Sequence, residues 1–307
     1  MSILLVATDR NLAKLQHLMQ QQLPEVDIYC WPDISSAALI EFAVLWKQPK
    51  GLLAQLPNLK AISSLGAGVD GILTDPDLSA DIPVCRIVDP DLSNQMAEYV
   101  LSVVLAFKCK LPLFLTQQQD TLWRPSRRLK LNNIVILGVG EIGMTVAQRL
   151  HNNGFMVKGW SRREKHHAII DCYCGEESLN ELTQWADVIV SVLPVTPATK
   201  NKFDDKFFQQ MKSTAFFINV GRGALVDEQA LFDALQNNEI AGACLDVFKQ
   251  EPLPQAHFLW SLGNLLITPH ISAITDTETV INQLIENYKR LSTGVKLNHL
   301  IDKNWGY

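Results

Sequence analysis

The sequence of 307 residues lacks the features typical of disulfide-rich, metal-binding and nucleic-acid-binding proteins. Its six cysteines form no Cys-x-x-Cys pair, and only Cys172 and Cys174 lie close together, at a spacing that matches no zinc site. We therefore expect reduced thiols and no bound metal. The net charge of −5 and the lack of a basic stripe argue against a nucleic-acid surface.

Long apolar stretches are also missing. The longest run, YVLSVVLAF at 99–107, is too short to span a bilayer. The first ten residues, MSILLVATDR, have no basic region before their apolar residues, so they predict a buried strand and not a signal peptide. We find no internal repeat and no low-complexity tract. With 47% hydrophobic residues the chain has ample material for a core, so we expect a cytoplasmic enzyme or binding protein without a membrane partner.

The chain does contain an alternation of short apolar runs and helical stretches, which predicts parallel strand–helix–strand units. The part before residue 100 holds the strand candidates ILLVA, VDIYC, FAVLW, LKAISSL and PVCRIV. The alternation restarts at residue 133 with NIVILG, MVKGWS, DVIVSVL, AFFINVG, GACLDVF and LLITPHI. Between the two series, residues 95–111 predict a buried helix, and the polar, proline-broken residues 116–132 predict a crossover arm.

This alternation predicts two domains of the α/β class. The last segment, 276–294, has helical spacing at Val280, Leu284 and Tyr288 and a glycine stop at Gly294. Because it follows the second series of strands, we expect it to return to the first domain. The predicted domains are residues 1–98 with 275–307, for the substrate, and residues 99–274, for a dinucleotide.

The dinucleotide prediction comes from IVILGVGEIGMTVAQRL, in which three glycines lie between an apolar strand and a helix. Gly138 would make the tight turn, Gly140 would let the backbone approach a pyrophosphate, and Gly143 would let helix and strand pack closely. The helix N-terminus, at Glu141 and Ile142, would then face the phosphates with unpaired amides. The alternative is a glycine-rich turn without a ligand.

The second strand of this series ends at Ser161, Arg162 and Arg163. An NAD site usually carries Asp or Glu here for the ribose hydroxyls, whereas a serine and two arginines suit a 2′-phosphate. We therefore predict NADP(H) as the preferred cofactor, with NAD(H) possible. The alternative is that the arginines form a solvated turn.

Three polar residues that suit reduction of a ketone follow the later strands. Arg222 follows FFINVG, Glu251 follows CLDVFKQ and His270 follows LLITP, so a parallel sheet would bring them to one edge. Histidine is the usual proton donor near neutral pH, and a carboxylate beside it fixes its tautomer. A guanidinium holds a carboxylate and polarises the adjacent carbonyl, so the anion that Arg222 binds would be a 2-oxo acid.

Each of these residues also has a structural alternative. His270 could be a strand-end histidine with satisfied ring nitrogens, and Glu251 in EPLP could cap a turn. Arg222 could pair with Asp227 or Glu228. The three residues together, downstream of a nucleotide motif, favour the catalytic interpretation.

The first domain is expected to supply a substrate cradle. The glycines of SSLGAGVDGI free backbone amides, so that those of Ala67, Gly68 and Val69 can hold a substrate carboxylate opposite Arg222. An ordinary strand–helix turn is the alternative.

Six stretches resemble, in order along the chain, the motifs of the D-isomer-specific 2-hydroxyacid dehydrogenase family. They are LGAGVD, LGVGEIG, LPVTPAT, NVGRGALVDEQAL, GACLDVFKQEPLP and ITPHISAIT. The likeness covers almost the whole chain. Within the family, the stretches LW, QMAEY, GWSR, HISAIT and a terminal GY are most similar to the reductases of glyoxylate and hydroxypyruvate. The resemblance implies two doubly wound parallel-sheet domains, a Rossmann cofactor domain and a flavodoxin-like, discontinuous substrate domain.

The resemblance also implies roles for individual residues. Arg222 would anchor the substrate, His270 would be the acid/base, Glu251 its partner, and Asp246 would contact the nicotinamide carboxamide. Trp46 would cap a small substrate pocket, with a packed core position as the alternative. Homodimers would form through the cofactor domain, with the arm near Trp123 around the partner. The predicted cofactor-binding residues are Gly138, Gly140, Glu141, Ile142, Gly143, Ser161, Arg162, Arg163, Leu193, Pro194, Thr199, Val220, Gly221 and Asp246.

The predicted function is NADPH-dependent reduction of short 2-oxo acids, glyoxylate to glycolate and hydroxypyruvate to D-glycerate, with His270 as general acid. One alternative is another D-2-hydroxyacid dehydrogenase, of the 3-phosphoglycerate or D-lactate type. The first of these needs extra cationic residues for a phosphate, which we do not identify in the sequence. The other alternative is a non-catalytic dinucleotide-sensing protein on the same fold.

Overall fold

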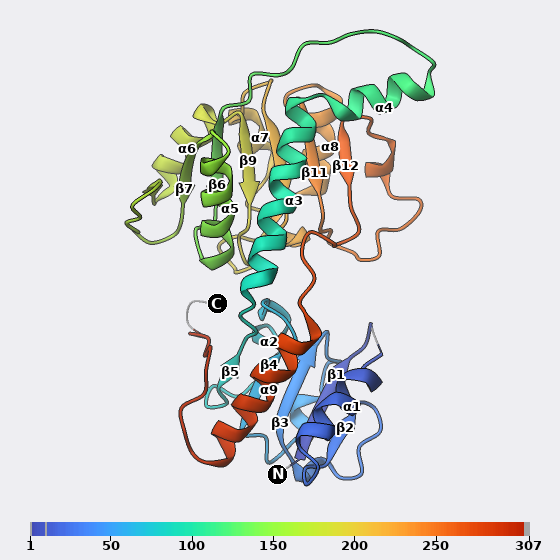
Figure 1. The fold of residues 1–307 in the computed structure, drawn as a ribbon, viewed down its shortest axis with the longest axis vertical. Coiled ribbons are helices and arrows are strands. Elements are labelled where there is room, and N and C mark those ends of the chain that lie inside the picture. Colours follow the sequence, from blue (N-terminus) through green and yellow to red (C-terminus); the bar gives the residue numbers. More distant parts are fainter. Residues whose placement is uncertain (1, 10, 304–307) are drawn as a thin grey trace. The chain divides into compact units, whose positions relative to one another are not determined.

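The computed structural model describes residues 2–9 and 11–303, and the chain forms two compact units (Figure 1). The first unit contains residues 1–90 and 275–307, and the second contains residues 91–274. The domain boundary predicted between residues 98 and 99 lies inside helix α3 (Pro90–Lys108), whereas the second unit begins at Asp91. The division into a substrate domain and a cofactor domain stays a prediction.

The first unit contains a five-stranded parallel sheet in the order β2-β1-β3-β4-β5, the flavodoxin-like doubly wound order. Adjacent residues of one strand alternate between its two faces. Ile3 and Leu5 of β1 share a core cluster with α1 and α9, and Leu4 and Val6 share the opposite cluster with α2 and η2. The elements of this unit are β1 (Ser2–Ala7), α1 (Ala13–Gln22), β2 (Ile28–Cys30), η1 (Ala37–Leu39), β3 (Ile40–Trp46), η2 (Leu53–Gln55), β4 (Ala61–Ser64), α2 (Asp70–Leu73), β5 (Val84–Cys85) and α9 (Thr277–Ser292).

The second unit contains a seven-stranded parallel sheet in the order β12-β11-β10-β9-β6-β7-β8. Counted from its own first strand, β6, this is the Rossmann order with one further strand. Its elements are α3 (Pro90–Lys108), α4 (Leu111–Gln119), β6 (Asn133–Leu137), α5 (Glu141–Asn152), β7 (Met156–Trp160), β8 (Asp171–Tyr173), α6 (Glu176–Trp185), β9 (Val188–Ser191), α7 (Asp205–Gln210), β10 (Phe216–Asn219), η3 (Gly223–Leu225), α8 (Glu228–Gln236), β11 (Gly242–Leu245), η4 (Phe258–Ser261) and β12 (Leu265–Ile267).

Helices cover both faces of this second sheet. Ile134 and Ile136 of β6 pack in the cluster that contains α3 and α5, which lie in front of the sheet in Figure 1. Val135 and Leu137 pack in the opposite cluster, with α6, α7 and α8. A sheet covered on both faces explains why its central strands β6, β9 and β10 lie in continuous apolar runs of the sequence.

The predicted strands and the observed strands agree, with one addition. Each apolar run named above contains a strand, and the additional strand is β8, a three-residue edge strand without an apolar run. The buried helix predicted at 95–111 begins earlier, at Pro90, because proline suits the first helical turn. Part of the predicted arm forms α4, and residues 120–132 have no regular secondary structure.

A single carboxylate connects the start of β6 to the start of β9. Asp187 Oδ2 accepts the amides of Asn132 and Asn133, both at 3.0 Å, and Oδ1 lies 2.8 Å from Lys212 Nζ. Burial by itself would raise the pKa of Asp187. The ammonium and the two amides outweigh burial, so the pKa lies below its ordinary value.

In the described part of the chain no single helix is long and apolar enough to cross a membrane. The pair α3 and α4 passes the same test of length and composition when the two helices are joined, but it is bent by 62°.

Candidate active site

Arg222, Glu251 and His270 follow three adjacent strands of the second unit, β10, β11 and β12. Parallel strands end at the same edge of a sheet, so the three loops are neighbours. A Cβ on Gly223, the residue after Arg222, would overlap the backbone of Phe248. Phe248 in turn donates its amide to Glu251 Oε1 at 3.1 Å. The loops that carry Arg222 and Glu251 are therefore in direct contact.

Glu251 and His270 form a hydrogen-bonded pair. His270 Nδ1 lies 2.9 Å from Glu251 Oε2, and the two side chains are 41% and 23% exposed. A carboxylate only accepts hydrogen bonds, so Nδ1 carries the hydrogen and Nε2 remains for a substrate. Glu251 also caps its own turn, because Oε1 accepts the Phe248 amide. The turn cap that was the structural alternative for Glu251 and the pairing with His270 are therefore both present.

His270 has a left-handed backbone conformation, with φ at 55°. Its amide donates to the carbonyl oxygen of Asp246 at 2.8 Å. The Asp246 carboxylate, which is fully buried, accepts the Thr268 hydroxyl at 2.6 Å and the amides of Ile271 and Ser272 at 2.9 Å. Asp246 therefore holds the His270 loop, and its contact with a nicotinamide carboxamide stays a prediction.

Arg222 lies half-buried between β10 and η3. Its Nη1 donates to Gly221 O at 2.7 Å, and Asn219 Nδ2 donates to the Arg222 carbonyl oxygen at 2.9 Å. The two acids considered as its ion-pair partners have contacts of their own. Asp227 caps α8, and Glu228 Oε1 accepts the amide of Lys249.

The glycine motif has the geometry that the sequence predicts. Gly138 has φ at 104°, and a Cβ on Gly143 would overlap the Gly138 carbonyl oxygen. A Cβ on Gly140 would meet no atom within 4 Å, so open space lies before its backbone. Gly140 is also the N-cap of α5, and as a glycine it has no side chain that could accept a helix amide, in contrast to Asp227 at α8. The first amides of α5, including those of Glu141 and Ile142, thus start a helix without a side-chain cap.

The loop after β9 connects the glycine motif to the turn before Arg222. A Cβ on Gly138 would lie 3.2 Å from Leu193 N, and a Cβ on Gly221 would lie 2.7 Å from Leu193 O. Val220 and Gly221 are buried beside this loop. Thr199 folds the loop, because its Oγ1 donates to Pro194 O at 2.7 Å.

Ser161, Arg162 and Arg163 form a turn at the end of β7. The Ser161 hydroxyl is buried and donates to the Arg163 carbonyl oxygen at 2.6 Å, and both arginine side chains are exposed. Lys165 Nζ donates to Val139 O, inside the glycine motif, at 2.7 Å. Lys165 was not predicted as a site residue. The sequence does place it as a third cation two residues after Arg163, which could have indicated it.

The predicted substrate residues of the first unit also lie at one edge of their sheet. Trp46 ends β3, and Ala67, Gly68 and Val69 follow the adjacent strand β4. A Cβ on Gly66 would lie 3.1 Å from Trp46 Cζ3, so the indole packs on this turn. Among residues 2–9 and 11–303, the amides of Ala67, Gly68 and Val69 have no hydrogen-bond acceptor.

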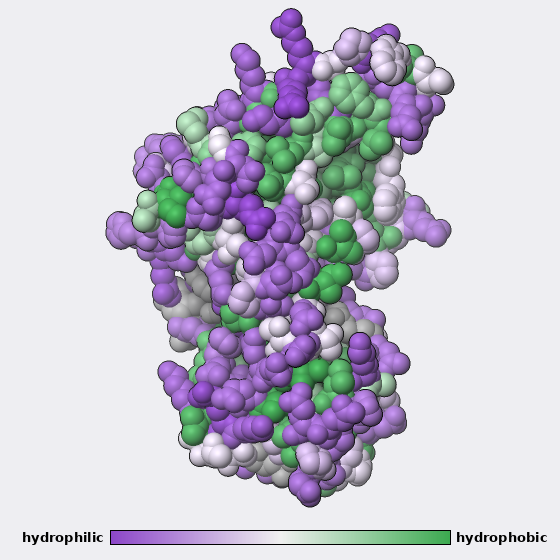
Figure 2. All heavy atoms as spheres, in the orientation of Figure 1, coloured by the Kyte–Doolittle hydropathy of each residue, from purple (hydrophilic) through white to green (hydrophobic). Residues whose placement is uncertain are grey.

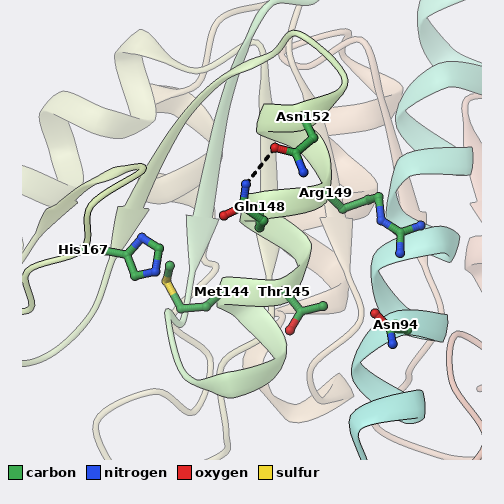
Figure 3. Close-up of a pocket in the computed structure, with 7 residues that line it drawn as sticks. All are labelled: Asn94, Met144, Thr145, Gln148, Arg149, Asn152 and His167. Atoms are coloured by element: carbon green, nitrogen blue, oxygen red, sulfur yellow. Dashed lines mark hydrogen bonds between the residues drawn. The ribbon is translucent and has the colours of Figure 1, made fainter.

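A groove of about 360 Å³ lies on the outer side of α5 (Figure 3). Among the residues that line it, Gln148 Nε2 donates to Asn152 Oδ1 at 2.7 Å. Arg149, which also lines the groove, pairs with Glu98 of α3 at 3.4 Å. None of the predicted site residues lines this groove. Within the described ranges no group of three or more His, Cys, Asp or Glu side chains has a metal-binding arrangement.

Comparison with known proteins gives consistent matches over the whole chain. Residues 101–272 match the model of the family described as D-isomer specific 2-hydroxyacid dehydrogenase, NAD binding domain. Glyoxylate/hydroxypyruvate reductase A of Yersinia enterocolitica is 35% identical over 298 residues, which cover 94% of each chain.

Solved structures also match this chain over its whole length. A D-isomer specific 2-hydroxyacid dehydrogenase from Xanthobacter autotrophicus, in complex with NADPH and MES, has a TM-score of 0.92 at 34% identity, covering 100% of this chain and 99% of that one. An NADPH-dependent glyoxylate/hydroxypyruvate reductase from Sinorhizobium meliloti, in complex with NADP and sulfate, has a TM-score of 0.91 at 28% identity, covering 100% of both chains.

Proposed function

The chain belongs to the D-isomer-specific 2-hydroxyacid dehydrogenase family and is an NAD(P)-dependent dehydrogenase, and from this premise we propose that it reduces short 2-oxo acids with NADPH. The proposed reactions are glyoxylate to glycolate and hydroxypyruvate to D-glycerate. The observation that carries the proposal is the 2.9 Å pair of His270 Nδ1 and Glu251 Oε2, next to the Arg222 turn and on the same sheet edge as the glycine motif.

The residues of the second unit fit a dinucleotide. The open space before Gly140 and the absence of a side-chain cap on α5 suit a pyrophosphate, because helix N-termini favour anions. Arg162 and Arg163 would bind the 2′-phosphate, and Lys165 lies close enough to the glycine motif to assist them. NADP(H) would therefore be preferred over NAD(H), in agreement with the NADPH and NADP complexes of the two similar structures.

When bound, the reduced nicotinamide supplies a hydride to the carbonyl carbon of the substrate. Arg222 would bind the substrate carboxylate with two hydrogen bonds and polarise the adjacent carbonyl group. His270 would give the proton on Nε2 to the carbonyl oxygen, so that a 2-hydroxy acid is formed. Glu251 would hold the hydrogen on Nδ1 and stabilise the charge that His270 carries before transfer. In the first unit, the substrate-binding roles expected of the Ala67, Gly68 and Val69 amides and of Trp46 stay a prediction.

The test is a steady-state assay that follows the loss of NADPH or NADH absorbance with glyoxylate, hydroxypyruvate, pyruvate and 3-phosphohydroxypyruvate. We expect turnover of the first two acids and a lower KM for NADPH than for NADH. His270→Ala should reduce turnover by about 10²–10⁴-fold, the range of general acid catalysis. Preference for pyruvate or the phosphorylated acid would move the assignment to another member of the family. Tight NADPH binding without turnover of any acid would favour a dinucleotide sensor.

We also propose a homodimer that forms through the second unit. Figure 2 shows hydrophobic side chains gathered beside α3 and α4. Large apolar side chains in and after α4 are between 41% and 100% exposed, which is unusual for a monomer surface, and they are Leu111, Leu113, Leu115, Leu122 and Trp123. Light scattering after size-exclusion chromatography would measure the mass, and Trp123→Ser should weaken the dimer.

A further inference from the structure

Two side chains of α3 hold both ends of the segment that contains His270. Gln95 Nε2 donates to Ile274 O at 3.1 Å, and Gln95 Oε1 accepts the Ile274 amide at 3.0 Å. The Tyr99 hydroxyl lies 2.6 Å from Thr268 Oγ1. Residues four apart on a helix lie on one face, so α3 presents both groups to the segment together.

The hydrogen bonds around Tyr99 have a single consistent direction. The Thr268 hydroxyl has one hydrogen and donates it to Asp246 Oδ1 at 2.6 Å, so Tyr99 must donate to Thr268. The Tyr99 oxygen then accepts from the thiol of Cys244, which lies 3.3 Å away. Burial raises the pKa of Tyr99 and raises the pKa of Cys244 to about 12, so both groups keep their hydrogens near neutral pH.

This chain of bonds ends at the backbone of His270. Asp246 accepts the amides of Ile271 and Ser272 through its carboxylate and the amide of His270 through its carbonyl oxygen. The left-handed conformation of His270 is unfavourable in a residue other than glycine, and it persists only when its surroundings enforce it. His270 and both residues beside it in sequence are exposed, so packing against a core does not enforce it.

We propose that Gln95 and Tyr99 are positioning residues, which hold the segment 268–274 so that His270 Nδ1 stays on Glu251. The inference rests on the proposed function for its kinetic consequences, because His270 is the acid there. Neither residue touches substrate or cofactor in this proposal. They act through Thr268, Asp246 and the backbone of Ile274.

The first test compares kcat and KM for variants that remove the hydrogen-bonding groups of one side chain at a time. Tyr99→Phe, Thr268→Val and Gln95→Met should each lower kcat about tenfold, the effect of losing roughly 1.4 kcal/mol of net hydrogen bonding, with KM for NADPH and the 2-oxo acid changed less than about twofold. Thr268→Ser keeps the hydroxyl and should recover most of the loss seen in Thr268→Val. Ser102→Ala is the matched control, because among the described residues its hydroxyl bonds only to Glu98 O of the same helix. A kcat in Tyr99→Phe and Gln95→Met equal to that of Ser102→Ala would overturn the proposal.

The second test is hydrogen exchange of the Ile271 and Ser272 amides in the protein without substrate. If α3 holds the segment, both amides should exchange about tenfold faster in Tyr99→Phe and Gln95→Met than in the wild type, because each variant loses about 1.4 kcal/mol of net hydrogen bonding. Exchange unchanged in both variants would overturn the proposal whether or not the enzyme is active. A wild type that turns over no 2-oxo acid would refute the proposed function, and the exchange rates would still decide whether α3 positions the segment.

Discussion

Replacing Glu251 by glutamine keeps the size of the side chain but removes one of its two acceptor oxygens. Oε1 accepts the Phe248 amide at 3.1 Å, and Oε2 lies 2.9 Å from His270 Nδ1. A glutamine side chain has one oxygen and one NH₂ group. Either the Phe248 amide or the N–H group of His270 Nδ1 would therefore face the NH₂ group, which is itself a donor. The Phe248 amide is fixed by a buried backbone, so we expect the oxygen to stay there and His270 to lose its acceptor.

The size of the effect follows from the hydrogen bond that is removed. A hydrogen bond to a charged group contributes about 1.5–3 kcal/mol, so Glu251→Gln should lower kcat by roughly 10- to 100-fold. Deleting the acid itself in His270→Ala should be at least as severe, at about 10²–10⁴-fold. KM for the 2-oxo acid should change little, because Arg222 is proposed to hold the carboxylate and the glutamine leaves its turn in place.

A double-mutant cycle in the steady-state assay tests the reasoning. Since Glu251 is proposed to act through His270, Glu251→Gln should lower the residual turnover of His270→Ala by less than about twofold. Glu228→Gln is the matched control, because Glu228 also accepts a backbone amide, at 3.0 Å, and lies 3.6 Å from a histidine, His257. The reasoning is refuted if Glu251→Gln costs the same factor with and without His270, or if it costs no more than Glu228→Gln.

Two further predictions concern the cofactor and stability. The double substitution Arg162→Ser, Arg163→Ser should raise KM for NADPH by roughly 10- to 100-fold for each hydrogen-bonded arginine–phosphate pair that it removes. It should leave KM for NADH unchanged. Arg127→Ser with Arg128→Ser, a second arginine pair outside the site, is the control, and an equal rise in KM for both cofactors would contradict the 2′-phosphate role. Asp187→Asn should lower the free energy of unfolding by about 1–3 kcal/mol at neutral pH. The folded state holds the pKa of Asp187 below its unfolded value, so this advantage of the wild type exists above about pH 4 and is lost as the pH falls through the folded-state pKa. Urea unfolding at neutral and acidic pH measures it, and a difference independent of pH would count against the explanation.

Most of the fold was predictable because both sheets are covered on both faces. A strand such as β10 is buried along its whole length, and a continuous apolar run marks it in the sequence. β8 was missed because an edge strand of three residues needs little burial, and its residues are half-exposed or exposed. The start of α3 at Pro90 was missed because its first turns contain the polar residues Asp91, Ser93 and Asn94 around a single apolar side chain, Leu92.

The candidate site was predictable where side chains follow a strand. Arg222 and His270 each stand three residues after the end of a strand that is apolar in the sequence, and the sheet order brings these strands to the same edge. Lys165, Gln95 and Tyr99 were not predicted as site residues, because their contacts are with backbone and hydroxyl groups that only the folded loops bring close. QMAEY is similar to a stretch of one subgroup of the family, but spacing alone says nothing about a partner 169 residues away.

The order of strands along the second sheet separates the proposed roles. Along β12, β11 and β10 lie the proposed proton donor, its carboxylate and the substrate anchor. The loops after β9 and β6 follow, with the pyrophosphate turn, and the proposed 2′-phosphate turn lies at the end of β7. Arg162 and Arg163 follow β7, whereas His270 follows β12. Replacing the two arginines should therefore change the choice of cofactor without altering proton transfer. An Arg162→Ser, Arg163→Ser enzyme saturated with NADH should therefore keep the kcat of the wild type with NADH, and a lower kcat would mean that the two ends of this edge are coupled.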